Sequence, residues 1–270
     1  MTQIKGSCVL ITGGASGIGR IMGRMVLEKG ARKLVIWDIN EQGIKDTIEE
    51  FRGKGDVKGY KVDVSDSKSV EECFRRTTWE CGNVDILINN AGIVTSNNTF
   101  DKMSINEIER TMSINATAPM TIALQALPQM IARNHGHICN IASAGGMIAN
   151  PKMSVYSASK WAVIGWSDSV RIELAQRKSN VRISTIAPYF INTGMFDGVK
   201  SRIFPILKPE PTAKKILKAI EKNRNFMGIP FGYHFIRFCQ ALLPTSIFDY
   251  IFGEVVGIFH AMDHFTGRKK

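Results

Sequence analysis

The sequence has 270 residues, and its hydrophobic content of 44% provides for a large core and excludes an intrinsically disordered chain. The formal net charge is +11, but Lys and Arg are scattered through the expected helices rather than clustered, so nucleic acid is not an expected partner. The five cysteines form no CxxC pair and no metal-ligand spacing, which indicates no metal site and favours a reducing, cytoplasmic compartment.

Residues 1–7 contain no signal peptide, and no apolar run reaches ~18 residues, so we expect that the chain does not cross a membrane by itself. No linker, internal repeat or low-complexity tract divides the chain. The expected organisation is a catalytic and cofactor-binding domain over residues 1–230, followed by an apolar helical extension of the same domain over residues 231–270.

Short apolar runs alternate with longer amphipathic stretches. The expected strands are Ser7–Thr12, Lys33–Asp38, Val57–Asp63, Val84–Asn90, His137–Ala142, Val181–Ala187 and Phe226–Ile229. The expected helices are Ile18–Lys29, Glu41–Arg52, Ser67–Glu80, Ser104–Thr111, Ser113–Asn134, Val155–Gln176 and Pro211–Lys222. This alternation predicts an α/β fold with a doubly wound parallel sheet, in which ligands bind at the carboxyl ends of the strands.

A glycine-rich turn joins the first strand to the first helix. Gly13 permits a tight turn, Gly17 allows the backbone to approach a pyrophosphate, and Gly19 allows the helix to pack on the sheet. The helix N-terminus offers free N–H groups to phosphates. We therefore expect a dinucleotide cofactor at this turn, with Ser16 and Ile18 also in contact; an ordinary strand-to-helix turn is the alternative.

Asp38 ends the second strand. An acidic residue there accepts hydrogen bonds from the adenosine ribose hydroxyls and repels a 2′-phosphate, and no basic residue follows at Ile39 or Asn40. The position predicts NAD rather than NADP as cofactor. The alternative is that Asp38 caps the next helix.

Further motifs follow in order along the chain. Asn89-Asn90-Ala91-Gly92 ends the fourth strand, and Tyr156-Ser157-Ala158-Ser159-Lys160 opens a long helix. Together with the glycine turn, these motifs resemble the short-chain dehydrogenase/reductase family over about Lys5–Gly228. The resemblance implies a catalytic tetrad of Asn115, Ser143, Tyr156 and Lys160. It also implies cofactor contacts from Asp63, Val64, Asn90, Ala91 and Gly92.

Tyr156 and Lys160 are four residues apart, so they lie one turn apart on one helix face. A nearby ammonium group favours tyrosinate, and we expect it to lower the pKa of Tyr156 from about 10. Tyr156 would then act as general base on an alcohol or general acid on a carbonyl. Ser143 would bind the same substrate oxygen, and Asn115 would hold a water that links Lys160 to solvent. If each residue is considered alone, Tyr156 could be a surface aromatic, Lys160 a solvated charge and Ser143 a strand-end cap.

The segment after the sixth strand begins with Pro188 and Tyr189, where the family often has Pro-Gly. The resemblance implies that the backbone at residues 189–191 lies beside the nicotinamide carboxamide and that Thr193 hydrogen-bonds this group. Pro188 and Ile191 are also expected to contact the cofactor. The run Asn192–Phe196 and the ending Met262–Arg268 resemble the retinol and 17β-hydroxysteroid dehydrogenase branch of the family.

The histidines give no metal site. His135 and His137 are expected in an exposed turn before a strand, and His260 and His264 have no glutamate base or third ligand nearby in the sequence.

A lipophilic alcohol or its carbonyl counterpart is the leading substrate class, because apolar residues crowd the expected substrate region: Met147, Ile148, Met153, Tyr189, Phe190, Met195, Phe196, Ile203, Phe204, Ile206 and Leu207. The alternatives are a smaller carbonyl substrate and a non-catalytic NAD-binding scaffold on the same fold.

The extension over residues 231–270 is rich in large apolar side chains, and Pro244 divides it into pieces too short to span a bilayer. Three fates are open for this apolar surface: it covers the substrate pocket, joins subunits, or lies in a membrane interface as a peripheral element. The segment Ala116–Ile131 is also more apolar than one buried face requires. Together with the family resemblance, this predicts a homodimer or homotetramer.

Overall fold

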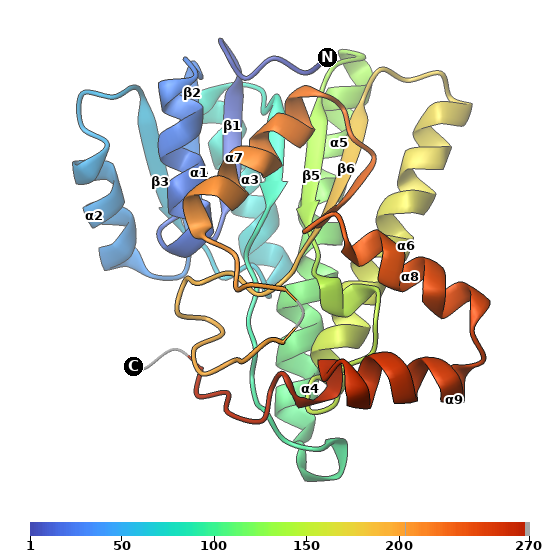
Figure 1. Ribbon diagram of the computed structural model, residues 1–270. Coiled ribbons are helices and arrows are strands. Elements are labelled where there is room, and N and C mark those ends of the chain that lie inside the picture. The colour runs from blue at the N-terminus through green and yellow to red at the C-terminus, as the bar shows by residue number, and fades with distance from the viewer. Residues whose placement is uncertain (203, 268–270) are drawn as a thin grey trace.

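The computed structural model describes residues 1–202 and 204–267 (Figure 1). Seven parallel strands form one sheet in the order β3-β2-β1-β4-β5-β6-β7. The strands are β1 (Cys8–Thr12), β2 (Lys33–Asp38), β3 (Val57–Lys61), β4 (Ile86–Asn89), β5 (His137–Ile141), β6 (Arg182–Pro188) and β7 (Phe226–Ile229). The doubly wound parallel sheet predicted from the sequence is therefore confirmed.

Alternate side chains of each strand enter different cores. In β1, Val9 and Ile11 join the core beneath α1 (Gly17–Glu28), α2 (Glu41–Glu50) and α7 (Pro209–Glu221). Cys8 and Leu10 point to the other face and join the core beneath α3 (Ser67–Cys81), α5 (Ala118–Ala132) and α6 (Ser154–Gln176). Figure 1 shows these two helical layers with the sheet between them. Burial on both faces explains why the strands are continuous apolar runs.

The chain leaves β1 toward β2 and β3 on one side, and returns at β4 on the other side of β1. This reversal of strand order opens a crevice beyond the carboxyl ends of β1 and β4, where ligands of doubly wound sheets bind. The fold thus brings the glycine turn and the Asn89–Gly92 segment to one place.

The sequence predicts one long helix over residues 113–134, and this prediction is wrong for its first turn. Helix α4 (Ile105–Met112) runs into a π-helical segment, η2 (Ser113–Thr117), before α5 begins. Pro119 has no N–H to donate to the carbonyl of Asn115, so the usual α-helical hydrogen bond cannot form there. The irregular turn therefore places Asn115 at a break in the helical hydrogen-bond pattern.

The expectation of an exposed turn at residues 135–137 is wrong for His137. This residue opens β5, is fully buried, and bonds through its two ring nitrogens to the hydroxyls of Thr2 and Ser184, each at 2.8 Å. Burial lowers the pKa of His137 to about 3, so the ring is neutral. The imidazole ties the N-terminal segment to β5 and β6.

Beyond β7 the chain forms α8 (Tyr233–Leu242), α9 (Thr245–Phe248), the π-helical segment η4 (Asp249–Val255) and the 3-10 turn η5 (Ile258–His260). Their inner side chains pack on a third core that also includes Met147, Tyr156 and Phe190. In Figure 1 these elements lie side by side below α6 and close one end of the molecule. Over residues 1–202 and 204–267, no helix combines the length and hydropathy that a bilayer crossing requires.

Candidate active site

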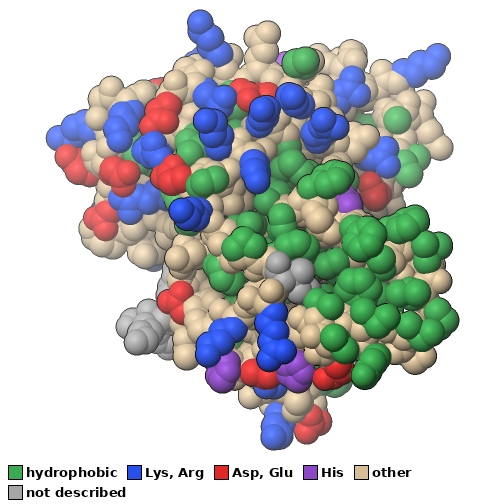
Figure 2. Space-filling view, viewed as in Figure 1, with side chains coloured by type: hydrophobic (Ala, Val, Ile, Leu, Met, Phe, Trp, Pro, Cys, Tyr) green, Lys and Arg blue, Asp and Glu red, His purple; other side chains and the backbone are tan. Residues whose placement is uncertain are grey.

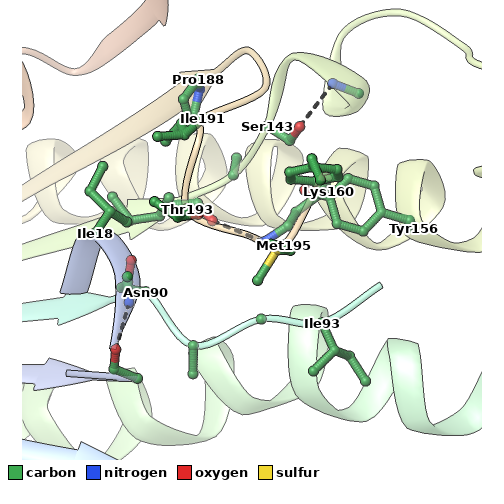
Figure 3. A pocket seen from close by; sticks show the side chains of 18 of the residues that line it. Ile18, Asn90, Ile93, Ser143, Tyr156, Lys160, Pro188, Ile191, Thr193 and Met195 are labelled. Atoms are coloured by element: carbon green, nitrogen blue, oxygen red, sulfur yellow. Dashed lines mark hydrogen bonds between the residues drawn. The ribbon is translucent and has the colours of Figure 1, made fainter. Parts of the chain in front are cut away.

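A cavity of about 320 Å³ lies beyond the carboxyl ends of the strands, and most of the sequence-predicted site residues line it (Figure 3). Gly19 and Asn115 are the two that do not. Figure 3 shows Ser143, Tyr156 and Lys160 gathered on one side of the pocket, with Ile18 and Asn90 on the other. The predicted residues that line the cavity are Gly13, Ser16, Gly17, Ile18, Asp38, Asp63, Val64, Asn90, Ala91, Gly92, Ser143, Tyr156, Lys160, Pro188, Ile191 and Thr193.

The glycine turn is held in shape by backbone geometry and by Asn90. Gly13 and Gly17 have positive φ angles of 64° and 52°, which residues with a side chain rarely adopt. Asn90 Nδ2 donates to the carbonyls of Thr12 and Gly13, at 3.0 and 3.2 Å. A Cβ on Gly19 would collide with the Gly13 carbonyl oxygen and with Asn90 Nδ2. The absence of a side chain at Gly19 therefore allows the start of α1 to approach the turn that follows β1.

Asp38 faces the glycine turn from the end of β2. Its Oδ2 accepts a hydrogen bond of 3.0 Å from the Ala15 N–H, and its Oδ1 accepts one of 3.0 Å from the Asn40 N–H. Asn40, not Asp38, caps helix α2, because the Asn40 side chain accepts from the Gly43 N–H. The alternative role of Asp38 as a helix cap is thus excluded.

Two further strand ends contribute to the same side of the pocket. Asp63 follows β3, and its Oδ1 accepts hydrogen bonds from the Ser65 backbone N–H and hydroxyl, at 2.9 and 2.6 Å. Val64 is buried beside it. After β4, the backbone N–H groups of Asn90 and Ala91 both donate to the Thr12 hydroxyl at 3.0 Å. This bond pair fixes the Asn89–Gly92 segment against the glycine turn.

Ser143, Tyr156 and Lys160 converge from β5 and α6. Ser143 caps the 3-10 turn η3 (Ala144–Gly146), with its Oγ accepting from the Gly145 N–H at 3.1 Å. Lys160 Nζ donates to the Ile141 carbonyl at 3.0 Å and lies 5.8 Å from the Tyr156 ring centroid. All three residues line the cavity, although Tyr156 and Lys160 are otherwise buried. The fold therefore places a phenol, a hydroxyl and an ammonium group at one wall.

The electrostatics of the pair differ from the sequence expectation. Burial raises the pKa of Tyr156 to about 12, and a hydrogen-bonding interaction with Ser143 opposes part of that rise. Burial also lowers the pKa of Lys160 to about 8. The expectation that Lys160 lowers the Tyr156 pKa is therefore wrong for the protein without ligands, because removal from water penalises the charged forms of both groups. In the protein without ligands, Tyr156 is a neutral phenol.

Asn115 is fully buried within η2, and its side chain is satisfied by one neighbour. Its Oδ1 accepts from the Ile93 N–H at 2.8 Å, and its Nδ2 donates to the Ile93 carbonyl at 2.9 Å. A Cβ on Gly92 would lie 3.3 Å from Asn115 Oδ1 and 3.6 Å from Lys160 Nζ. Asn115 thus lies behind Gly92, close to Lys160, and holds the loop after β4.

The loop after β6 brings Pro188, Ile191 and Thr193 to the pocket (Figure 3). A Cβ on Gly17 would lie 3.6 Å from the Thr193 Cβ, so this loop faces the glycine turn. Tyr189, which departs from the family's usual glycine, is buried, and its hydroxyl donates to Ser201 Oγ at 2.9 Å.

Apolar and aromatic side chains surround the free space near Tyr156. The lining residues beyond the candidate polar ones include Ile148, Met153, Tyr189, Phe190, Met195 and Phe196. Four other residues of the expected substrate region do not line the pocket. Met147 is part of the core beside it, Phe204 and Leu207 pack against that core, and Ile206 is exposed. Ile203 and Arg268 fall outside the described residues.

Sequence reasoning missed several lining residues: Ile93, Arg110, Ile114, Asn150, Tyr233 and Ile258. Tyr233 and Ile258 come from the C-terminal elements α8 and η5, which reach the pocket only through tertiary packing. Ile114 could have been found as the neighbour of Asn115. No sequence signal distinguishes the others from ordinary apolar or surface residues.

Comparison with known proteins matches residues 7–203 to the family described as short chain dehydrogenase. Epidermal retinol dehydrogenase 2 of Mus musculus is 36% identical over 274 residues, which cover 99% of this chain and 88% of that protein. Estradiol 17-beta-dehydrogenase 11 of Homo sapiens is 32% identical over 244 residues, covering 90% and 81%. A short chain dehydrogenase/reductase from Burkholderia phymatum, solved in complex with NAD, has the same fold, with a TM-score of 0.80 and 24% identity, covering 93% of this chain and 97% of that one.

Proposed function

The chain belongs to the short chain dehydrogenase family, and from this premise we propose that it transfers a hydride between NAD(H) and a lipophilic alcohol or its carbonyl counterpart. The observation that carries the proposal is the position of Tyr156. Its phenol lines a cavity beside Ser143 and Lys160, and the remaining walls near it are apolar.

The residues at the glycine turn fit a dinucleotide. Gly13 and Gly17 keep the backbone open, and the first turn of α1 contains no acidic residue that would repel a pyrophosphate. The Asp38 carboxylate stands at the end of β2, and each of its oxygens has lone pairs left for a ribose hydroxyl. The nicotinamide, when bound, supplies or accepts the hydride. Asp63 and Val64 would flank the adenine, and Pro188, Ile191 and Thr193 would hold the carboxamide end.

Tyr156 is proposed as the general acid–base group. As a neutral phenol it can donate a proton to the oxygen of a carbonyl substrate, and in the reverse direction the phenolate accepts the proton of an alcohol. Ser143 is placed to hydrogen-bond the same oxygen and to favour the phenolate. Lys160 would bind the ribose hydroxyls beside the nicotinamide, and its positive charge would lower the energy of the phenolate.

Asn115 is proposed to serve the proton path through its backbone. Pro119 deprives the Asn115 carbonyl of its α-helical donor, while the side chain is engaged with Ile93. We propose that this carbonyl holds a water between Lys160 and solvent.

A lipophilic substrate is proposed because Tyr189, Phe190, Met195 and Phe196 line the same cavity as Ser143 and Tyr156. These side chains offer few hydrogen bonds to the several hydroxyls of a sugar, which would lose water without compensation. The names of the relatives agree with this class, since one is a retinol dehydrogenase and another an estradiol dehydrogenase.

The test is a substrate panel with NAD+ and NADP+, followed at the nicotinamide absorbance. Retinoid, steroid and long-chain alcohols are compared with small sugar alcohols. Turnover of a lipophilic alcohol with NAD+ is expected. Turnover of the sugar alcohols alone would favour the smaller-substrate alternative, and cofactor binding without turnover of any compound would favour the non-catalytic scaffold.

We also propose a homodimer or homotetramer that uses α5 and α6. Both helices leave large apolar side chains at the surface: Leu124, Ile131, Trp161 and Ile172. Light scattering at micromolar concentration tests the assembly, and a monomer there would contradict it. The chain is further proposed to meet its substrate at a membrane surface without spanning it, since lipophilic alcohols reside there.

A further inference from the structure

The C-terminal elements expose two apolar stripes. On α8 the exposed side chains are spaced by three and four residues, so they lie on one helix face, and Phe231, two residues before the helix, continues this spacing. They are Phe231 (83% exposed), Phe235 (65%), Phe238 (60%) and Leu242 (65%). After Pro244, α9 and η4 continue the surface with Ile247 (47%), Tyr250 (66%), Ile251 (39%) and Val255 (61%).

We call these eight residues the apolar stripe surface, and in Figure 2 hydrophobic side chains gather over α8 and α9 on the viewed face. The opposite sides of the same elements are buried, since Tyr233, Ile236 and Phe248 pack in the core. Core packing therefore does not account for the exposed side. An exposed patch of this kind marks an interaction site.

The same face of the molecule carries a row of basic side chains over α7 (Figure 2). Lys214, Lys215, Lys218 and Lys222 are exposed, and none of them forms an ion pair anywhere within residues 1–202 and 204–267.

The acidic residues of α7 cannot neutralise these lysines, because they are engaged elsewhere. Glu210 pairs with Arg24 of α1 at 2.7 Å, and Glu221 pairs with Lys29, beyond the end of α1, at 2.8 Å. The lysine row thus presents uncompensated positive charge next to an apolar surface.

We propose that the apolar stripe surface and the lysine row together dock the protein on an anionic phospholipid membrane. Apolar side chains enter the boundary between headgroups and acyl chains, and lysines attract the anionic headgroups. A second copy of the chain fits this face less well than an anionic membrane, because the copy carries the same positive charge beside its own apolar surface and offers no complementary negative charge there.

Docking on this face brings the pocket to the lipid. Tyr233 lines the cavity from the inner side of α8, whose outer side carries part of the apolar stripe surface, and Ile258 lines it from the following turn η5. The wall between substrate space and membrane is then one layer of helices. This step rests on the proposed lipophilic substrate, whereas membrane binding itself is measured without cofactor or turnover, so the two can fail separately.

The test is flotation of the full-length protein with vesicles of phosphatidylcholine, with and without phosphatidylserine, at about 0.1 M and about 1 M salt. The variant Phe235→Ser/Phe238→Ser/Leu242→Ser should bind phosphatidylserine vesicles at least tenfold more weakly at both salt concentrations. The variant Lys214→Gln/Lys215→Gln/Lys218→Gln should lose roughly 100-fold at low salt, because each lysine near an anionic surface contributes about fivefold. At high salt it should match the unaltered protein, since screening removes the charge contribution.

Matched controls come from α3 and the loop after β4. Trp79→Ser/Phe100→Ser removes comparably exposed apolar side chains, and Lys68→Gln/Arg75→Gln removes exposed charges; neither should alter flotation. Circular dichroism verifies that each variant is folded. Undiminished flotation of the stripe variant, or no flotation of the unaltered protein with phosphatidylserine at low salt, overturns the proposal. A stripe variant that changes the mass by light scattering and keeps its vesicle binding would show instead that this face joins two copies.

Discussion

The Lys160 ammonium donates a 3.0 Å hydrogen bond to the carbonyl of Ile141, the last residue of β5. The bond fixes the side chain of a buried lysine between the strand that leads to Ser143 and the helix that carries Tyr156. It does not fully replace the lost water, because burial still lowers the pKa of Lys160 to about 8. The protein therefore retains a charged lysine at a position where the charge lowers the stability of the fold.

Lys160→Met should abolish turnover and stabilise the fold. The difference between a pKa of 10.5 and one of about 8 means that burying the charged Lys160 costs about 3 kcal/mol at neutral pH. In the variant the Ile141 carbonyl loses its hydrogen bond, which reduces the gain in stability by about 1 kcal/mol. We expect a gain of about 1–2 kcal/mol in the free energy of unfolding, measured by denaturant titration at pH 7. The exposed Lys68→Met is the control and should change stability little.

Lys160→Met should also change how the stability of the fold depends on pH. The folded pKa of Lys160 lies below the unfolded value, so the unfolded state binds more protons between pH 8 and 10.5, and native stability should rise with pH across that window. Lys160→Met should lack this rise. A variant that is less stable than the parent at pH 7 would show that the hydrogen bond outweighs the cost of burial.

Tyr156→Phe tests the proton-transfer role. The substitution keeps the ring in the core and removes the hydroxyl, so turnover should fall by about 10²–10⁴, the usual contribution of a general acid–base group. Affinity for NAD(H), measured by fluorescence titration, should change little. Tyr250→Phe removes the hydroxyl of an exposed tyrosine and serves as control. Turnover within threefold of the parent would refute the assignment.

The fold and the Tyr156–Lys160 pair could be predicted from sequence because both rest on local patterns. Strand and helix periods are read over a few residues, and a spacing of four fixes two side chains on one helix face. The glycine turn is likewise contiguous, so its place after β1 was clear.

The features that sequence reasoning missed depend on distant parts of the chain. The burial of His137 requires Thr2 and Ser184, and the contribution of Tyr233 to the pocket requires α8 to fold back on the core. The pKa of Tyr156 followed burial rather than the neighbouring charge, and burial is a tertiary property.

Cofactor preference should depend on Asp38 and on the exposed Ile39. Asp38→Ser removes the carboxylate that would repel a 2′-phosphate, and Ile39→Arg adds a cation beside it, so the double variant should move preference from NAD(H) toward NADP(H). The measurement is kcat/KM with each cofactor. Ile39→Arg alone is the control and should shift the ratio less. Better use of NADPH than NADH by the unaltered protein would show that Asp38 was misinterpreted.

The direction of the reaction should respond to pH through Tyr156. Because burial raises the pKa of Tyr156 to about 12, the phenol stays protonated at neutral pH, as carbonyl reduction requires. Alcohol oxidation needs the phenolate, so its kcat/KM should rise with pH between about 7 and 9, while that of reduction stays nearly constant. Parallel profiles for the two directions would argue that another group limits proton transfer.

The apolar wall predicts how substrate size controls affinity. The Phe196 ring lies with its centroid 6.0 Å from that of Tyr156 and 5.0 Å from that of Phe190, so it borders the place where the reacting carbon must sit. Phe196→Ala removes much of this wall, and loss of about 1.5–3 kcal/mol of apolar contact should raise KM for a lipophilic alcohol about tenfold or more. A short-chain alcohol contacts only the part of the ring nearest Tyr156, so its KM should rise less than that of the lipophilic alcohol, and NAD(H) affinity should be unaffected. Phe100→Ala, which removes an exposed ring, is the control. Equal losses for long and short alcohols would indicate that Phe196 supports the position of Tyr156 rather than the substrate, because a displaced phenol impairs every substrate alike.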